Sequence, residues 1–269
     1  MTAQTLTEMR MLLQRHGLKP RTSLGQHFLA DPNITRRIVT AAGVKEGDRV
    51  LEVGPGTGTL TRQLVTAGAS VTAIEIDQQL EPVLLETMRG LPVDLLFLDA
   101  STVDYRELLG EGPWKVVANL PYQVGTQLVL DWLRMVPAII EMTVMVQLEV
   151  AQRMTAPTGS SAYGLPSVVA GLHADLKLLF RVPPHVFYPP PNVESAIIRV
   201  IRKEAPSRAE TAIELAAAGF GQRRKMLRRS LALILPNAEE ALRSAGIDPT
   251  KRAEDLSPED YLRLAAVPP

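Results

Sequence analysis

The segment Asp48-Arg49-Val50-Leu51-Glu52-Val53-Gly54-Pro55-Gly56-Thr57-Gly58 sets the class of fold that this chain is expected to adopt. Its first half is an apolar run of strand length, and its second half has glycine at alternate positions. Helical spacing follows from Thr59 to about Ala67. Glycine lets a backbone pass close to a ligand, and the N-terminus of the next helix favours a group that accepts hydrogen bonds. The pattern predicts a strand, a ligand-binding loop and a helix; a tight turn without a ligand is the alternative interpretation.

Acidic residues end the next two predicted strands. Residues 71–77 form an apolar run that carries Glu75 near its end, where α/β folds bind a ribose diol. Residues 94–99 form a third run, which ends in Asp99 before Ala100 and is suited to accept the amino proton of an adenine ring. Solvated strand-end acids are the alternative for each residue taken alone. Together, the three strands predict an α/β domain that binds a nucleoside.

The glycine spacing and the acid before the loop indicate which nucleoside is bound. The loop lacks the G-x-G-x-x-G spacing of nicotinamide dinucleotide sites. Glu52 beside the loop would repel a pyrophosphate but attract the cationic sulfonium and amino group of S-adenosylmethionine, directly or through water. We therefore expect S-adenosylmethionine as the cofactor, with a nicotinamide oxidoreductase as an alternative.

A polar turn follows a fourth predicted strand at residues 115–118. In this turn Asn119 offers a side-chain carbonyl, and Leu120 offers a backbone carbonyl before Pro121. Both groups can accept N–H bonds from an exocyclic amine on a planar ring, while Tyr122 offers a stacking face. Pro121 has a fixed φ and stiffens the turn. The segment is expected to hold a nucleobase; an ordinary strand-to-loop turn is the alternative.

Two more segments are expected to border this pocket. Residues 20–29 are too polar and too rich in glycine for a regular element, and we expect a basic arm that can close over a ligand. The proline-rich segment 186–191 holds Phe187 in a stiff backbone between two predicted strands of an antiparallel edge. Phe187 is expected to form the second wall of the base pocket opposite Tyr122, with a hydrophobic plug as the alternative.

The C-terminal part of the chain is predicted to be helical, with segments at about 208–219, 222–235, 238–245 and 257–266. We therefore expect residues 1–204 to form a catalytic domain with an arm at 1–30, and residues 205–269 to form a small helical domain. The second predicted helix contains a dense basic run that can neutralise RNA phosphates, formed by Arg223, Arg224, Lys225 and Arg228. A solvated helix face is the alternative.

Composition excludes several classes of site. The chain has no cysteine, which excludes disulfides, thiolate metal sites and cysteine nucleophiles, and its four histidines lack metal-ligand spacing, so no metal is expected. Lys+Arg and Asp+Glu are equal at 29 each, so only the distribution of charge can indicate nucleic-acid binding. The sequence has no apolar run of membrane-spanning length and no secretory signal, so we expect a cytoplasmic protein without a membrane partner. We also expect a monomer.

Taken in order, the motifs resemble those of the ribosomal RNA adenine N6-dimethyltransferase family, and most closely its bacterial small-subunit members. The resemblance extends over nearly the whole chain and rests on Leu24–Leu29, Glu52–Gly58, Glu75–Asp77, Asp99–Ala100, Asn119–Tyr122, Phe187–Ser195 and Arg223–Lys225. It implies a Rossmann-like, S-adenosylmethionine-dependent methyltransferase fold of the α/β class, with a mostly parallel seven-stranded sheet and a small C-terminal helical domain.

The resemblance also implies roles for individual residues. Glu75 would bind the ribose of S-adenosylmethionine, and Asp99 would bind its adenine. The implied cofactor site comprises Gln26, His27, Leu29, Glu52, Gly54, Gly56, Glu75, Ile76, Asp99, Ala100 and Asn119. The implied catalytic set, which holds the target base, comprises Asn119, Leu120, Pro121, Tyr122 and Phe187. His27 departs from the family, which usually has Asn here, and would make this cofactor contact dependent on pH.

The implied activity is N6,N6-dimethylation of two adjacent adenosines in a hairpin loop near the 3′ end of 16S rRNA. The substrate would be the immature 30S subunit, and the protein would take part in subunit biogenesis. The alternatives are a large-subunit RNA methyltransferase of the macrolide-resistance type and an assembly factor whose RNA binding matters more than its catalysis. The leucine in the Asn119–Tyr122 turn and the long basic helix favour the small-subunit enzyme.

Overall fold

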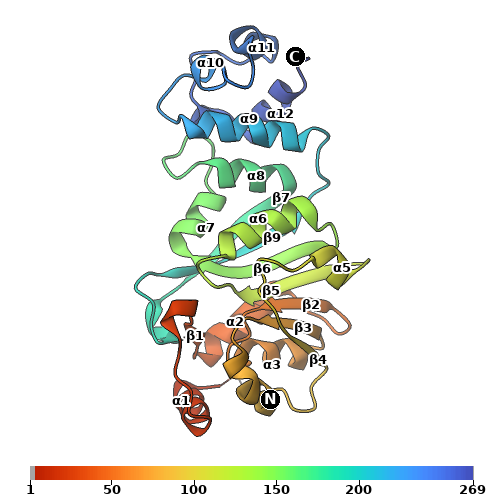
Figure 1. The fold of residues 1–269 in the computed structure, drawn as a ribbon, viewed down its shortest axis with the longest axis vertical. Coiled ribbons are helices and arrows are strands. Elements are labelled where there is room, and N and C mark those ends of the chain that lie inside the picture. The colour runs from red at the N-terminus through yellow and green to blue at the C-terminus, as the bar shows by residue number, and fades with distance from the viewer. Residues whose placement is uncertain (1–3, 269) are drawn as a thin grey trace. The chain divides into compact units, whose positions relative to one another are not determined.

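The computed structural model describes residues 4–268, which divide into two compact units (Figure 1). The first unit comprises the chain up to Ala151 together with Lys177–Ile201, and the second comprises Gln152–Leu176 with the chain from Arg202 onward. The expected boundary at residue 205 is close to the last crossing between the units. The expectation nevertheless left residues 152–176 out of the second unit, to which the structure assigns them.

The first unit is built on a seven-stranded sheet with the strand order β4-β3-β2-β5-β6-β9-β7. The strands are β2 (Arg49–Val53), β3 (Ser70–Glu75), β4 (Val93–Phe97), β5 (Trp114–Asn119), β6 (Ile139–Gln147), β7 (Ala174–Val182) and β9 (Ser195–Arg202). Parallel pairs join β2 to β3 and β5, β3 to β4, and β5 to β6, whereas β9 is antiparallel to β6. This arrangement confirms the predicted Rossmann-like, mostly parallel sheet.

Helices connect the parallel strands, and their caps are local in sequence. They are α1 (Leu6–Arg15), α2 (Pro32–Ala42), α3 (Thr59–Thr66), α4 (Glu81–Thr87), α5 (Tyr105–Leu109), α6 (Gly125–Met135) and α7 (Leu148–Met154), the last of which crosses the unit boundary. The Asp31 carboxylate caps α2 by accepting the N–H groups of Asn33 and Ile34 at 2.7 and 3.0 Å. Because parallel strands connected in this way end on one side, the carboxyl ends of β2 to β5 form a common edge, where such folds bind ligands.

The N-terminal arm is anchored at both of its ends. Helix α1 contributes Met9, Leu12 and Leu13 to an apolar cluster that also contains Leu80, Val83 and Leu84. After a 3₁₀ turn at Thr22–Leu24, the arm forms β1 (Phe28–Leu29), which pairs antiparallel with β8 (Phe187–Tyr188). The segment between these anchors is therefore held by contacts distant in sequence, although its residues predict no regular element.

The second unit is helical, as the sequence predicted for the C-terminal part. It contains α8 (Leu165–His173), α9 (Ala209–Gly221), α10 (Leu227–Ser230), α11 (Ala238–Ser244) and α12 (Pro258–Ala265). Two buried tyrosines hold it together, because Tyr163 donates to the Leu256 carbonyl and Tyr261 donates to the Ala253 carbonyl, both at 2.9 Å. Helix α8 contacts α9 and α12. These contacts explain why the segment before β7 belongs to this unit.

The prediction of a long basic helix over residues 222–235 is wrong. Residues 222–225 form a turn, closed by a bond of 2.8 Å from the Lys225 N–H to the Gln222 carbonyl, and the α-helix resumes only at Leu227. Leu227 is fully buried, and its N–H bonds to the Lys251 carbonyl at 2.8 Å. These tertiary contacts override the local helical spacing.

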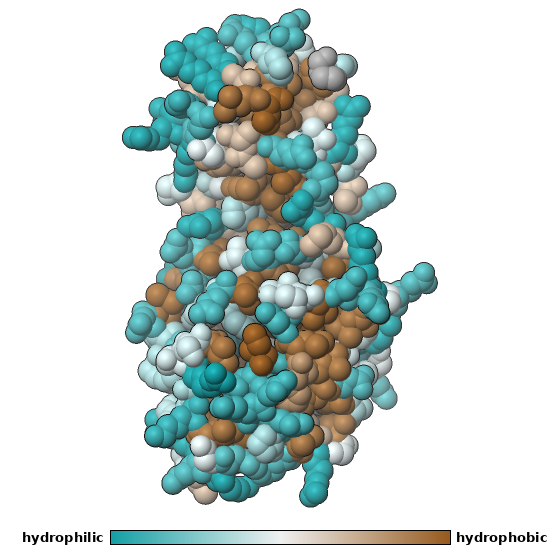
Figure 2. Space-filling model, in the orientation of Figure 1, coloured by the Kyte–Doolittle hydropathy of each residue, from teal (hydrophilic) through white to brown (hydrophobic). Residues whose placement is uncertain are grey.

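The face drawn in Figure 2 is mainly hydrophilic, with hydrophobic side chains gathered in patches between the polar ones. Leu233 in the second unit is the clearest exposed apolar side chain, with 85% of its surface accessible. No helix among residues 4–268 is long and apolar enough to cross a membrane.

We expect Gly171→Val to destabilise the second unit. A Cβ atom on Gly171 would lie 2.9 Å from Pro258 Cγ, so the larger side chain would force α8 away from α12. Overpacking of this kind costs about 1–3 kcal/mol. Gly221→Val is the control, since no described atom lies within 4 Å of its added Cβ. The free energy of unfolding in urea should fall much more for Gly171→Val; an equal decrease in both variants would contradict the packing of α8 in this unit.

Candidate functional site

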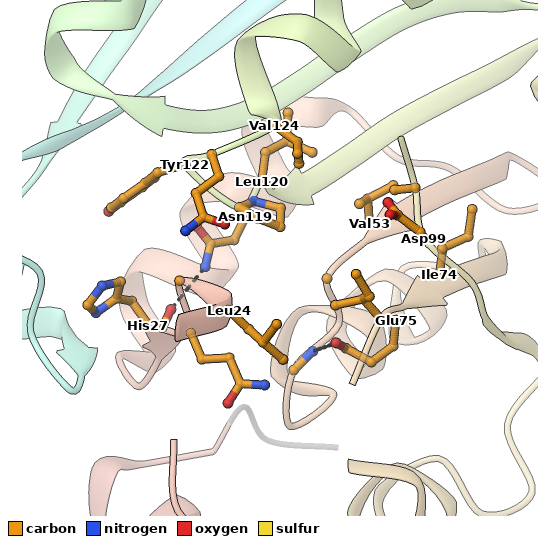
Figure 3. A pocket seen from close by; sticks show the side chains of 18 of the residues that line it. Leu24, His27, Val53, Ile74, Glu75, Asp99, Asn119, Leu120, Tyr122 and Val124 are labelled. Carbon is orange, nitrogen blue, oxygen red and sulfur yellow. Dashed lines mark hydrogen bonds between the residues drawn. The ribbon is translucent and has the colours of Figure 1, made fainter. Parts of the chain in front are cut away.

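A pocket of the first unit opens at the carboxyl edge of the sheet, where β2, β3 and β5 end (Figure 3). The predicted site residues that line it are Gln26, His27, Gly54, Gly56, Glu75, Ile76, Asp99, Ala100, Asn119, Leu120, Pro121 and Tyr122. Leu29 and Glu52 line a small neighbouring cavity that shares Gly54, Gly56 and Asn119 with the pocket. Sequence reasoning assigned no role to the apolar residues of the wall, whose only signal is a position within or close to a motif: Leu24, Val53, Ile74, Leu98 and Val124.

The glycine loop lies too close to the arm to accommodate a side chain. Gly56 has a φ of +59°, and a Cβ atom there would lie 2.7 Å from the Phe28 ring. A left-handed backbone of this kind favours glycine. The Gly56 N–H also donates to Glu75 Oε2 at 3.2 Å. The loop, the arm and the end of β3 therefore form one continuous wall of the pocket.

Glu75 is buried at the end of β3, with 5% of its surface exposed. Its Oε1 accepts the Asp77 N–H at 3.0 Å, and its Oε2 accepts the Gly56 N–H. Burial raises the pKa of Glu75, while these two N–H bonds oppose the shift. Each carboxylate oxygen has a second lone pair, so Glu75 can accept from the hydroxyls of a ribose while it holds the loop.

Asp99 lies after β4 and is exposed on the pocket wall. The Ser101 hydroxyl and N–H both donate to its Oδ1, at 2.6 and 2.9 Å, and these bonds hold the pKa of Asp99 below its usual value. Within the described residues Oδ2 accepts no hydrogen bond. An ionised acceptor is therefore available to the amino group of a purine.

Glu52 is a buried acid that lacks a counter-charge among the described residues. Only 1% of its surface is exposed, and burial raises the pKa of Glu52 to about 8, with the Thr61 hydroxyl opposing this and the charge of Glu75 adding to it. No described donor has the geometry of a hydrogen bond to its Oε2. An unpaired buried acid costs stability, so Glu52 beside the glycine loop indicates a site for a donor group or a cation.

The Asn119–Tyr122 turn presents two unused acceptors and a ring. Asn119 Nδ2 donates to the His27 carbonyl at 3.2 Å, which leaves Oδ1 as an acceptor. The Leu120 carbonyl accepts no hydrogen bond from the described residues. The Tyr122 hydroxyl shares a bond of 2.6 Å with the Ser195 hydroxyl, which fixes the ring from its far end. This is the combination of groups that the sequence predicted for holding an exocyclic amine.

Phe187 does not line the pocket, which contradicts its expected place as the second wall. Its ring is 3% exposed and belongs to an apolar cluster with Leu29 and Ile197. The pairing of β1 with β8 sets this position, because it places Leu29 opposite Phe187. The ring that faces Tyr122 is instead that of His27, with centroids 5.8 Å apart and an interplanar angle of 26°.

A buried carboxylate fastens the arm beside the pocket. Asp77 is 3% exposed and accepts hydrogen bonds from Arg21 Nη1 at 3.0 Å and Gln26 Nε2 at 2.7 Å. Gln26 Oε1 in turn accepts the Arg21 N–H at 2.7 Å. Gln26 thus lies on the pocket wall, but its amide holds the arm. Sequence reasoning missed this role of Asp77, whose signal was an acid at the end of the Glu75–Asp77 motif.

The four basic residues predicted to bind RNA differ in how their charge is compensated. Arg223 Nε pairs with Glu254 at 2.6 Å and Arg223 Nη2 donates to the Ser161 carbonyl at 3.0 Å, all within the second unit. Arg228 lies 3.6 Å from the Glu239 carboxylate. Arg224 and Lys225 are exposed and form no ion pair with a described residue. Among these four residues, the uncompensated positive charge is therefore that of Arg224 and Lys225.

Comparison with known proteins identifies the group to which the chain belongs. The model of the family described as ribosomal RNA adenine dimethylase matches residues 17–267. A ribosomal RNA small subunit methyltransferase A of Phenylobacterium zucineum is 44% identical over 269 residues, covering 98% of this chain and 94% of the relative.

The crystal structure of a dimethyladenosine transferase from Plasmodium falciparum is similar with a TM-score of 0.77 and 25% identity, covering 88% of this chain and 96% of the other. That of the 23S rRNA methyltransferase ErmE has a TM-score of 0.70 and 29% identity, covering 88% and 98%. The chain therefore belongs to the ribosomal RNA adenine dimethylase family.

Proposed function

We propose that this protein dimethylates N6 of adenosines in small-subunit ribosomal RNA, with S-adenosylmethionine as the donor. The observation that carries the proposal is the pair of unused acceptors, Asn119 Oδ1 and the Leu120 carbonyl, beside the Tyr122 ring. Two acceptors and a stacking face suit an aromatic amine. The same pocket continues to Glu75 and Asp99, which suit a nucleoside donor.

The residues of the pocket and of the small neighbouring cavity fit S-adenosylmethionine at three points. Glu75 would hold its ribose hydroxyls, and Asp99 would hold the amino group of its adenine. Glu52, whose Oε2 has no partner among the described residues, would hold its cationic amino end beyond the glycine loop. When bound, S-adenosylmethionine supplies a methyl group on a positively charged sulfur.

The Asn119–Tyr122 turn would prepare the adenine amino group for attack. This group is a poor nucleophile because its lone pair is delocalised into the ring. Acceptors at Asn119 Oδ1 and the Leu120 carbonyl bond its two N–H groups and favour a pyramidal nitrogen whose lone pair is free. Stacking on Tyr122 fixes the flipped base in the pocket. A monomethylated amine retains one N–H, so one of these acceptors can hold it for a second transfer.

The choice of small-subunit RNA is supported by sequence likeness. The relative named for the small subunit shares more of its sequence with this chain than the 23S rRNA methyltransferase does. The long basic helix no longer supports this choice, because residues 222–225 form a turn. On this likeness we infer that the protein acts on two adjacent adenosines near the 3′ end of 16S rRNA in the immature 30S subunit. It would act as a monomer in the cytoplasm and would contribute to subunit assembly.

Methyl transfer from labelled donor to immature small subunits, followed by nucleoside analysis, tests the function. Wild-type protein should yield dimethyladenosine. Asn119→Ala should lower the single-turnover rate at saturating RNA and donor about 5- to 150-fold, because removing a hydrogen bond costs roughly 1–3 kcal/mol. Gln127→Ala, which removes an exposed amide on α6, is the control. An Asn119→Ala protein that reacts at the wild-type rate would rule out this role for the turn.

Donor binding should release a proton from Glu52 near pH 7. With its pKa at about 8, the Glu52 carboxyl is mostly protonated in the free protein at this pH, and a bound cation would lower that pKa and ionise it. The binding enthalpy measured by calorimetry should therefore depend on the ionisation enthalpy of the buffer. The proton release should decrease as the pH rises above the Glu52 pKa of about 8, where Glu52 is already ionised and the donor's own amino group loses its proton. Glu52→Gln should show no release near pH 7, and a proton release equal to wild type would contradict the assignment.

The exposed charges of the second unit should contribute to RNA affinity. Replacing Arg224 and Lys225 by Ala should flatten the dependence of log affinity on log salt, by about 0.7–0.9 for each phosphate that is no longer neutralised. Donor binding should not change. Arg89→Ala, at another exposed arginine, is the control. An unaltered salt slope would show that the turn at 222–225 is a solvated surface.

A further inference from the structure

The hydroxyl of Tyr122 is bonded within the protein. It shares a hydrogen bond of 2.6 Å with the Ser195 hydroxyl, and neither hydroxyl forms another hydrogen bond with residues 4–268. Tyr122 lines the pocket, whereas Ser195 is fully buried and does not line it. Figure 3 shows the Tyr122 ring beside Asn119, away from Glu75 and Asp99. The ring is therefore held through its hydroxyl, next to the acceptors proposed for the adenine amino group.

Strand β6 holds both ends of this hydrogen bond. On one side, Asn119 pairs with Met145, and the Leu120 N–H bonds to the Met145 carbonyl at 3.1 Å. On the other side, Ser195 pairs with Gln147, two residues further along β6. Since alternate residues of a strand lie on the same face of a sheet, the partners of Met145 and Gln147 also share one face. The Ser195 hydroxyl is thus placed by the sheet rather than by a surface loop.

The Tyr122 hydroxyl is not suited to act as a base. Burial raises the pKa of Tyr122 above its usual value, and the bond to Ser195 opposes this. A phenol that stays protonated near neutral pH cannot take a proton from the adenine amino group. Tyr122 therefore offers the base the face of its ring, and its hydroxyl serves to hold that ring.

A stacking face orients a base only if its own plane is fixed. A tyrosine side chain turns about two bonds, and rotation about the second is only weakly restricted. The turn restrains the backbone here, because the Pro121 carbonyl accepts from the N–H groups of Val124 and Gly125 at 3.2 and 2.9 Å. Methyl transfer requires reacting atoms that are aligned. A ring that can tilt would tilt the stacked adenine and turn its lone pair away from the methyl group.

We propose that Ser195 is a positioning residue for methyl transfer, because its hydroxyl fixes the plane of the Tyr122 ring on which the target adenine stacks. The proposal rests on the proposed function, because it concerns the orientation of the same base. Ser195 lines neither the pocket nor the small neighbouring cavity, so it acts only through Tyr122.

A double-mutant cycle isolates this hydrogen bond. Ser195→Ala and Tyr122→Phe each remove one hydroxyl and keep the ring at position 122, and the double variant removes both hydroxyls. Thr143→Val is the matched control, because it removes another buried hydroxyl of the same sheet that bonds to no described residue.

Single-turnover methyl transfer to immature small subunits is measured with the protein in excess, at saturating concentrations of protein and donor. Donor affinity is measured by calorimetry without RNA. Under these conditions a loss of stability alone leaves the rate unchanged, because the folded protein still saturates the RNA.

We expect Ser195→Ala and Tyr122→Phe each to lower the rate about 2- to 13-fold, the factor that corresponds to one neutral hydrogen bond. The double variant should react no more slowly than the slower single variant, because both substitutions remove the same bond. Thr143→Val should equal wild type, and donor affinity should be unchanged in all four variants. Coupling of this kind in the rate at saturation is a result that a merely structural role would not produce.

Different outcomes would overturn the proposed function and the role of Ser195. If wild-type protein transfers no methyl group to adenosine in the subunits, the proposed function fails, and the inference fails with it. If wild-type protein is active and Ser195→Ala reacts at the same rate, only the inference is overturned. It is also overturned if the effects of the two single substitutions multiply in the double variant, or if Thr143→Val is as slow as Ser195→Ala. If Ser195→Ala does not fold by circular dichroism, Tyr122→Phe decides: a wild-type rate overturns the inference, and a slower rate with unchanged donor affinity supports it.

Discussion

The close approach of the arm to the glycine loop is the constraint on which the rest of the site depends. The Phe28 ring occupies the space that a Cβ atom on Gly56 would need, so the arm can lie there only because position 56 has no side chain. From this position the arm continues into the pairing of β1 with β8 and brings the His27 carbonyl to the Asn119 amide. The sites proposed for the donor and for the base thus share one steric condition, since the arm lines both.

Three buried acids lie at the same edge of the sheet, and they differ in which groups bond to their carboxylates. This difference distinguishes an acid that stabilises the protein from acids that are free to bind a ligand. Asp77 is paired with the Arg21 guanidinium and the Gln26 amide, so its charge is used within the protein. Glu75 is held by backbone N–H groups and keeps lone pairs for a ligand. Glu52 has no counter-charge within residues 4–268, and burial raises its pKa to about 8. A buried acid that destabilises the free protein near neutral pH is most easily explained by a ligand that completes its hydrogen bonds and charge.

The backbone of the segment Phe187–Ser195 and its last side chain hold other parts of the site in place, whereas the Phe187 ring packs in the core. β8 holds β1 in register, the Pro189 carbonyl holds the His27 ring, and the Ser195 hydroxyl holds the Tyr122 ring. The prolines of the segment restrict its backbone, which suits this role. In the second unit, the charge of Arg223 is used within the protein, because its guanidinium pairs with Glu254 and donates to the Ser161 carbonyl.

The sequence by itself determined the α/β class, the glycine loop, the strand-end acids Glu75 and Asp99, and the turn at Asn119–Tyr122. These are local patterns, and the carboxyl ends of parallel strands necessarily meet at one edge, so naming the strands was enough to assemble the pocket. Only the tertiary structure decided that His27 rather than Phe187 faces Tyr122, that Asp77 fastens the arm, and that residues 222–225 form a turn. Each of these depends on a contact between residues far apart in the chain, such as Leu29 with Phe187 or Leu227 with Lys251. Local spacing carries no information about such partners, because the energy of burial and of long-range hydrogen bonds exceeds local preference.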